Sequence, residues 1–385
     1  MHTHGTGHSR PVRIRAAVLD EDGHIVLKDV DLAPPGPGEV RVRIVAAGVC
    51  HSDLHVTSGA WQVPRPLVLG HEGSGVVTAV GEGVDELDVD DHVVLSWVPG
   101  CGRCRTCRAG RPAQCSLVAS TVAPGGVLYD GTTRLSDESG PIHHYLGVSS
   151  FAEEAVVPAS GAIRVRDDAP LEDVAIIGCA IATGVGAVRN TASVRPESTV
   201  AVIGCGGVGL ACIQGARLAG ATRIVAVDVV ADKLELAITL GATDTVDATA
   251  VPDVVAALRS VIPDGYDYVF DAIGKIHTTE QAIAALGLGG AAVIVGLPAE
   301  GEHATFDPLA LAEADQRILG CNYGSSIPHR DIPELVDEMM AGRLDLASMI
   351  SARRPLSEAA DALADLAAGH ALRQLLLPNS DAVEG

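Results

Sequence analysis

Four cysteines crowd into one short segment of this 385-residue chain. Cys101, Cys104, Cys107 and Cys115 give the spacing C-x2-C-x2-C-x7-C. Four thiolates complete a tetrahedral zinc site with no open position, which is typical of a structural metal. The rival interpretation is an iron–sulfur cluster, but the bacterial ferredoxin pattern needs three residues and then Cys-Pro at its last ligand. Here the last gap is seven residues and Ser116 follows, so the spacing favours zinc.

A second set of possible metal ligands is spread along the chain. Cys50 lies in GVCHSDLH, His71 in LGHEGSG and Cys179 in IIGCAIATG, each after an apolar run and beside small residues. Two thiolates and one imidazole would leave the fourth position of a zinc ion open for water or substrate, as in catalytic sites. Spacing alone does not bring these three residues together, and taken singly each would more often be a buried core side chain.

A glycine-rich turn predicts a dinucleotide site. Gly204, Gly206 and Gly209 spell G-x-G-x-x-G directly after the apolar run TVAVI and before a helix-like segment. The first glycine permits a tight turn, the second lets the backbone approach a pyrophosphate, and the third lets helix and strand pack closely. Asp228 follows 19 residues after Gly209, where its carboxylate would bind the ribose and repel the 2′-phosphate of NADP. The pattern therefore favours NAD, and Lys233 could reach the same ribose.

The pattern of apolar and polar residues in the segments that must position these side chains changes along the chain. Short apolar or alternating runs, separated by glycine and proline, predict a β-barrel-like region at 16–20, 39–49, 69–81 and 91–97. Residues 116–150 form a long polar stretch with few regular signals. From about Val174, strand-like and helix-like runs alternate, which predicts a doubly wound parallel sheet. The chain closes on two helical segments and a short strand, at 331–342, 356–369 and 372–378.

Composition excludes several classes of function. Hydrophobic residues make up 47% and charged residues 20%, so a sizeable core is expected. A formal net charge of -22 repels phosphate backbones and anionic lipid surfaces, so neither nucleic acid nor a membrane is an expected partner. The start, MHTHGTGHSR, lacks the features of a secretory signal and is interpreted as a disordered tail containing His2, His4 and His8. Nine cysteines, an odd number with four of them clustered in Cys101–Cys115, and no export signal indicate a reducing, cytoplasmic compartment.

Taken together, these motifs are similar to those of one enzyme family. The chain resembles the medium-chain, zinc-dependent alcohol dehydrogenases in the order and spacing of the segments around Cys50, His71, Cys101–Cys115, Cys179 and Gly204–Gly209. The likeness runs from about Arg13 to Pro378. The long 116–150 stretch resembles the dimeric type, close to the class I and class III enzymes, whereas polyol dehydrogenases tend to have a shorter loop there.

The resemblance implies an α/β protein with two domains and two zinc ions per subunit. Residues 1–180 and 323–385 would form a GroES-like, β-rich catalytic domain that carries both zinc sites. Residues 181–322 would form a doubly wound, parallel-sheet Rossmann domain that binds NAD. A homodimer is the family expectation.

The resemblance also implies roles for residues near the catalytic zinc, which Cys50, His71 and Cys179 would hold. Glu72 would lie behind the metal and could exchange with a ligand. Asp53 would hydrogen-bond the other nitrogen of the imidazole ligand and fix its tautomer. The proton of the alcohol would pass to the catalytic pair Ser52 and His55.

Cofactor contacts are implied in the same way. His51 and Arg373 would contact the pyrophosphate, and because the family often has arginine where His51 stands, cofactor affinity would be weaker or pH-dependent here. Thr183 would lie against the nicotinamide, and backbone groups of Val295 and Leu297 would bind it. The glycine loop would contribute Gly204, Gly206, Gly207, Val208 and Gly209.

The implied activity is reversible oxidation of a primary aliphatic or aromatic alcohol to an aldehyde by hydride transfer to NAD. A pocket lined by Trp61, Ile181 and Leu297 would favour such small-molecule substrates over sugars. The alternative within the family is a thiol-adduct-dependent formaldehyde dehydrogenase. The segment Ser116–Ala119 has no arginine to bind an adduct's carboxylates, which disfavours a glutathione adduct but not another thiol carrier. From another class, a non-catalytic NAD-binding scaffold would be expected to lack a zinc ligand or Ser52.

Overall fold

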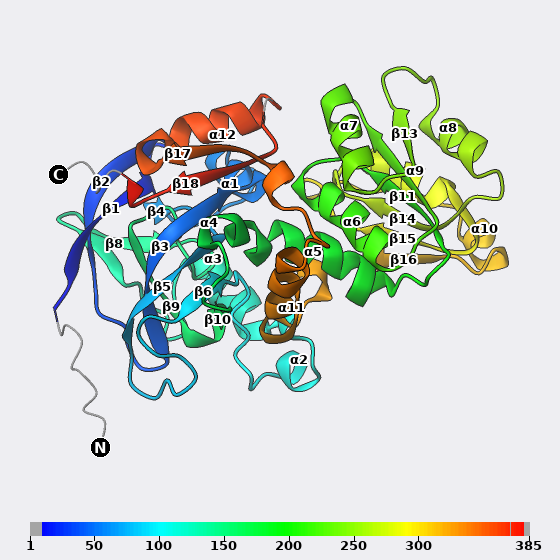
Figure 1. Cartoon of the computed structure of the whole chain (residues 1–385). Coiled ribbons are helices and arrows are strands. Elements are labelled where there is room, and N and C mark those ends of the chain that lie inside the picture. Colours follow the sequence, from blue (N-terminus) through cyan, green and yellow to red (C-terminus); the bar gives the residue numbers. More distant parts are fainter. Residues whose placement is uncertain (1–9, 370, 381–385) are drawn as a thin grey trace. The chain divides into compact units, whose positions relative to one another are not determined.

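The computed structural model describes residues 10–369 and 371–380, so His2, His4 and His8 lie outside the described residues. The chain folds into two compact units (Figure 1). The first comprises Met1–Cys179, Ile327–Gly342 and Met349–Gly385, and the second comprises Ala180–Ser326 and Arg343–Ser348.

The first unit contains a closed five-stranded barrel. Its order is β1-β2-β7-β8-β4, with bounds β1 Val12–Leu19, β2 Ile25–Leu32, β7 Leu135–Asp137, β8 Gly140–His144 and β4 Leu67–Val68. The strands β7 and β8 belong to the polar 116–150 stretch, in which no strands were predicted. They are three and five residues long, too short to show a clear alternation, but Leu135 and Ile142 fill the barrel interior.

A seven-stranded sheet forms the rest of this unit's β structure. Its order is β10-β6-β5-β3-β18-β17, with β9 paired to β3, and the bounds are β10 Ala162–Arg164, β6 His92–Leu95, β5 Gly73–Val80, β3 Glu39–Val49, β18 Arg373–Leu377, β17 Ile350–Pro355 and β9 Glu154–Pro158. The helices of the unit are α1 His51–Thr57, α2 Arg105–Arg108, α3 Ala123–Gly125, α4 Leu171–Val174, α11 Pro328–Met340 and α12 Ala359–Ala367. The prediction for the strand at 39–49 is confirmed, because its apolar residues are buried on both faces of the sheet.

The second unit is built on a six-stranded sheet in which every pairing is parallel. Its order is β13-β12-β11-β14-β15-β16, with bounds β13 Asp244–Asp247, β12 Arg223–Asp228, β11 Thr199–Ile203, β14 Tyr266–Asp271, β15 Leu286–Ile294 and β16 Arg317–Gly320. The helices are α5 Ala180–Gly186, α6 Gly207–Leu218, α7 Ala231–Leu240, α8 Val254–Val261, α9 Ile276–Ala284 and α10 Pro308–Glu313. This order confirms the doubly wound sheet (Figure 1).

Three parts of the chain that were expected in the catalytic domain belong to the second unit, namely Ala180, Tyr323–Ser326 and Arg343–Ser348. Hydrogen bonds explain this. The Gln214 side chain donates to the Asp345 carbonyl at 3.0 Å and accepts from the Asp345 N–H at 2.8 Å. The Ser326 hydroxyl donates to the carbonyl of Ala182 at 3.3 Å.

The helices of the chain are short. Among the residues that the structure describes, no single helix is long and apolar enough to cross a membrane, although the bent pair Leu171–Gly178 and Ala180–Ala192 passes the same test of length and composition.

Candidate functional site

The first unit brings the three scattered candidate ligands together. Ligand atoms of Cys50, His71, Glu72 and Cys179 all lie within 4.8 Å of one another, and all four side chains are buried. Cys50 follows β3 as the N-cap residue of α1, His71 and Glu72 link β4 to β5, and Cys179 follows a 3-10 turn, η4 Ala175–Gly178. Segments far apart in the sequence therefore converge on one buried group of donors.

Asp53 orients this group through both of its carboxylate oxygens. One oxygen accepts the Cys50 N–H at 3.1 Å. The other accepts the Gly70 N–H at 3.1 Å and lies 3.5 Å from Nδ1 of His71. Nε2 of His71 is therefore the nitrogen left to face the sulfur atoms, and in the described part of the chain it has no hydrogen-bond partner. A buried nitrogen without a partner is costly, and a metal ion would satisfy it.

The two sulfur atoms influence each other's ionisation. A hydrogen bond from Cys179, supported by the positive charge of Arg373, holds the pKa of Cys50 well below its usual range. The same sulfur contact, together with burial, raises the pKa of Cys179. Two neighbouring buried thiols can both become thiolates only if a cation lies between them, so this donor set fits Zn²⁺.

Glu72 belongs to this group of donors and pairs with Arg373. An Arg373 amino group donates to the Glu72 carboxylate, and both side chains are almost fully buried. Burial raises the pKa of Glu72 to about 7, against the opposing charge of Arg373. A Cβ at Gly48 would collide with the Glu72 carboxylate, so glycine makes room for it. The expected pyrophosphate contact of Arg373 stays a prediction, since its observed partner is Glu72.

The expected proton path begins beside the cluster. The Ser52 hydroxyl lies 3.9 Å from the Cys50 sulfur. His55 lies three residues further along α1, is partly exposed, and its ring centroid is 4.8 Å from that of Trp61. His51, at the start of the same helix, is exposed. The proton-transfer and pyrophosphate roles of these residues stay predictions.

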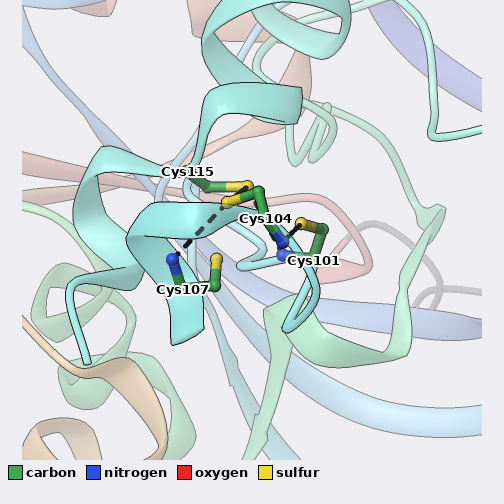
Figure 2. A group of neighbouring side chains, drawn as sticks. All are labelled: Cys101, Cys104, Cys107 and Cys115. Carbon is green, nitrogen blue, oxygen red and sulfur yellow. Dashed lines mark hydrogen bonds between the residues drawn. The ribbon is translucent and has the colours of Figure 1, made fainter. Parts of the chain in front are cut away.

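Figure 2 shows the four-cysteine lobe. The ligand sulfurs of Cys101, Cys104, Cys107 and Cys115 lie within 4.8 Å of one another, and those of Cys104 and Cys115 are 4.0 Å apart. Zn–S bonds of about 2.3 Å in a tetrahedron require sulfur separations of roughly 3.8 Å. Backbone N–H groups point at three of the sulfurs, each at 3.4 Å. These bonds stabilise thiolates, and the lobe fits a closed structural zinc site.

The glycine loop has the geometry of an anion site. Gly204 has φ of +97°, and a Cβ at Gly209 would collide with the Gly204 carbonyl, so both positions require glycine. A Cβ at Gly206 would meet no described atom within 4 Å. Helix α6 begins at Gly207, directly after this open position, so its N-terminal N–H groups would face an approaching pyrophosphate.

Apart from His51 and Arg373, which belong to the first unit, the other expected cofactor residues lie in the second unit. Asp228 ends β12, and its carboxylate accepts the Cys205 N–H at 2.6 Å. Lys233 lies on α7 and the buried Thr183 on α5. Val295 donates its N–H to Asp271, so its carbonyl is the backbone group left for a nicotinamide. Leu297 is 53% exposed.

A segment that carries no motif in the sequence supports the His71 loop. Ser150 donates its N–H to Gly70 at 3.0 Å and its hydroxyl to the Glu72 carbonyl at 2.6 Å, and Phe151 donates its N–H to Leu69 at 3.0 Å. Ser150 ends the polar 116–150 stretch, and Phe151 follows it. Their only signal in the sequence is a Ser-Ser pair between apolar Val148 and Phe151.

Known proteins share this architecture. The models described as "Alcohol dehydrogenase GroES-like domain" and "Zinc-binding dehydrogenase" match residues 36–167 and 207–341. A probable S-(hydroxymethyl)glutathione dehydrogenase 1 of Schizosaccharomyces pombe is 38% identical over 349 residues, which cover 90% of this chain and 92% of that protein.

Two solved structures extend the comparison. An alcohol dehydrogenase zinc-binding domain protein from Burkholderia ambifaria has a TM-score of 0.92 and 40% identity, covering 96% of this chain and 100% of that one. The benzyl alcohol dehydrogenase of Acinetobacter calcoaceticus has a TM-score of 0.90 and 35% identity, covering 95% and 99%. With both family models and these similarities, the chain belongs to the medium-chain, zinc-dependent alcohol dehydrogenase family.

Proposed function

We propose that this oxidoreductase uses NAD and a catalytic zinc ion to oxidise a primary aliphatic or aromatic alcohol reversibly to the aldehyde. The observation that carries the proposal is the buried set of Cys50, His71 and Cys179, whose ligand atoms lie within 4.8 Å of one another. Three such ligands leave one zinc position for the substrate, as in catalytic zinc sites. The four-cysteine lobe would hold a second, structural zinc ion.

The residues of the chain would divide the reaction between them. When bound, zinc supplies a Lewis acid that lowers the pKa of an alcohol, and NAD supplies the hydride acceptor. Ser52 takes the alcohol proton, and His55 releases it toward solvent. Asp53 holds the ring of His71 in the tautomer whose Nε2 faces the metal. Glu72 forms an ion pair with Arg373 and so holds this positive charge next to the ligand group of Cys50, His71 and Cys179.

We propose the second unit as the NAD-binding domain and the first as the catalytic domain. The open backbone at Gly206 and the start of α6 would receive the pyrophosphate. Asp228, a carboxylate at the end of β12, supports NAD over NADP because a 2′-phosphate would meet a like charge.

A second candidate function is oxidation of a thiol adduct of formaldehyde. The similarity to an S-(hydroxymethyl)glutathione dehydrogenase favours it. The segment Ser116–Ala119, which offers no arginine for an adduct's carboxylates, and the similarity to a benzyl alcohol dehydrogenase favour simple alcohols. We therefore place simple alcohols first.

The test is an NAD reduction assay with a panel of alcohols and with formaldehyde, each with and without added glutathione. We expect thiol-independent turnover of benzyl or medium-chain primary alcohols that a zinc chelator abolishes. Turnover of formaldehyde only with thiol would overturn the primary proposal in favour of the second candidate. No turnover by zinc-loaded protein in any condition would contradict both, as expected for a non-catalytic NAD-binding scaffold.

We also propose a cytoplasmic homodimer. All nine cysteines are free, which fits a reducing compartment. Strand β16 is the last strand of the parallel sheet, and exposed apolar side chains accompany this end of the sheet, with Leu288 85% and Leu309 65% exposed. An unpaired strand edge beside apolar side chains is typical of a surface that pairs with a second copy.

A further inference from the structure

Tyr145 lies in an unusual turn directly after β8. Leu146, Gly147 and Ser149 have backbone φ angles of +52°, +70° and +58°. Residues other than glycine rarely adopt this left-handed region. The Ser149 hydroxyl fixes this turn by accepting the Tyr145 N–H at 3.0 Å and donating to the Val68 carbonyl at 3.0 Å. Strained backbone of this kind persists where its surroundings hold it, and it is concentrated at functional sites.

The Tyr145 side chain touches two parts of the candidate active site at once. Its hydroxyl donates to the backbone carbonyl of Ser52 at 3.0 Å. Its ring packs edge-on against the ring of His71, with centroids 5.4 Å apart and planes at 90°. Tyr145 is 2% exposed and His71 is 1% exposed. One buried side chain therefore joins a zinc-ligand candidate to the residue expected to take the alcohol proton.

The start of α1 depends on such contacts. Within α1, the Asp53 side chain accepts the Cys50 N–H and so caps the first turn. From outside the helix, the Tyr145 hydroxyl donates to the carbonyl of Ser52, the second residue of α1. The Ser52 hydroxyl lies only 3.9 Å from the Cys50 sulfur, so any shift of this turn moves that hydroxyl relative to the zinc ligands.

We propose that Tyr145 is a positioning residue for proton removal, which holds the Ser52 hydroxyl in register with the zinc ligands through its bond to the Ser52 carbonyl. The inference rests on the proposed function, in which Ser52 takes the alcohol proton. Small misplacements of a reacting group reduce rates strongly, so loss of one hydrogen bond is expected to act on kcat more than on substrate binding.

The test is Tyr145→Phe, which keeps the ring against His71 and removes only the hydroxyl. We expect kcat for the preferred alcohol to fall about 3- to 10-fold with KM changed less than about twofold. We also expect a larger solvent isotope effect and a shift of the pH dependence of kcat toward higher pH. Zinc content and the absorption bands of the cobalt-substituted protein should stay as in the wild type.

Tyr266→Phe is the matched control. Tyr266 is also buried, and its hydroxyl donates to the Leu258 carbonyl at 2.9 Å, in the second unit. It should lower Tm as Tyr145→Phe does, but leave kcat, the isotope effect and the pH dependence unchanged.

The outcomes separate this inference from the proposed function. If the wild type shows no alcohol turnover, the proposed function fails first. If the wild type is active and Tyr145→Phe keeps its kcat and pH dependence, or loses zinc together with activity, the positioning role is overturned. If Tyr145→Phe does not fold, Ser149→Ala keeps the phenol but removes its backbone anchor, and wild-type kcat and pH dependence in that variant would overturn the inference.

Discussion

Asp228 ends strand β12 with both carboxylate oxygens in contact with backbone N–H groups. One oxygen accepts from Cys205 in the glycine loop at 2.6 Å, and the other accepts from Val229 at 2.8 Å and Val230 at 3.0 Å. The carboxylate therefore shapes the loop as well as carrying the charge that would meet the ribose. The position of Asp228 after the glycine loop led to the prediction that its charge faces the ribose. Its hydrogen bonds to the loop become visible only in the structure.

The charge can be tested with a variant that keeps the size of the side chain and part of its hold on the loop. Asp228→Asn keeps one oxygen acceptor but removes the negative charge, so we expect the ratio of kcat/KM for NADP to that for NAD to rise about tenfold or more. Asp247→Asn, at the end of the neighbouring strand β13, is the control and should leave the ratio unchanged. An unchanged ratio in Asp228→Asn, measured with both cofactors at one ionic strength, would contradict the proposed role.

His144 gives the first unit a sensitivity to acid. Burial lowers the pKa of His144 to about 3, and Nε2 accepts the Arg134 N–H at 3.0 Å. The folded protein keeps this ring neutral, whereas the unfolded chain takes a proton below about pH 6.5. The contribution of neutral His144 to the free energy of unfolding is therefore complete above about pH 6.5 and is lost as the pH falls toward 3. At pH 5 the loss amounts to about 2 kcal/mol.

We therefore expect His144→Gln, which keeps an acceptor but does not titrate, to flatten the decline of stability with falling pH. Denaturant unfolding at pH 7 and pH 5 should show a wild-type loss about 2 kcal/mol larger than that of the variant. His143→Gln, on the adjacent and less buried residue, serves as the control and should retain the wild-type slope. Parallel slopes for wild type and His144→Gln would show that His144 is not the acid-sensitive group.

At the scale of elements, the four-cysteine lobe contains little regular secondary structure. Its helix α2 spans only Arg105–Arg108, too short to be stable alone. The lobe also exposes Arg103, Arg105 and Arg108, after which trypsin can cleave, whereas Pro112 blocks cleavage after Arg111. The metal should therefore maintain the fold of this segment.

Cys107→Ser should leave one zinc ion per chain and open the lobe. We expect trypsin to cleave the variant within residues 103–111 at least tenfold faster than the wild type, because loss of a metal ligand removes most of the local stability. Cys212→Ala alters a buried cysteine of α6 outside both clusters, and it should keep two zinc ions and resist cleavage. Equal cleavage rates for Cys107→Ser and wild type would exclude a zinc-dependent lobe.

Comparison of the strands shows which of them a sequence pattern can predict and which it cannot. Strand β3 was predicted at 39–49 with its observed bounds, because a long apolar run buried on both faces leaves a clear signal. Strands β7 and β8 were missed because they are short and lie within a polar stretch. The ligands were assigned by type and by resemblance, but the contact of Tyr145 with Ser52 joins residues 93 positions apart and leaves no local pattern.

At the scale of the whole molecule, the residues expected to bind zinc and the glycine loop expected to bind NAD lie in different units. The metal-ligand groups lie in Met1–Cys179 of the first unit, and the glycine loop and Asp228 lie in the second. The bounds expected from the sequence differ from those of the observed units at Ala180, Tyr323–Ser326 and Arg343–Ser348, where tertiary hydrogen bonds leave no pattern in the sequence.

The prediction at the scale of the whole molecule is that the protein forms a homodimer. If this end of the sheet pairs with a second copy, a charge on α10, the helix that precedes β16, should break the pairing, so we expect Leu309→Glu to convert a dimer to a monomer in sedimentation experiments. Val89→Glu changes a residue of similar exposure, 53%, in the first unit and should remain dimeric. A wild type that sediments as a monomer at micromolar concentration would refute the proposed dimer.

The most direct test of the central claim is the zinc content of the wild type and of Cys50→Ala, measured together with NAD-dependent alcohol oxidation, with Cys212→Ala as the matched control. We predict two zinc ions per chain and turnover for wild type and Cys212→Ala. Cys50→Ala should keep one zinc ion and lose at least about 1,000-fold in kcat, because three ligands are needed for a catalytic zinc. Wild-type turnover by Cys50→Ala, or two zinc ions retained in it, would contradict the assignment of Cys50, His71 and Cys179 as the catalytic metal site.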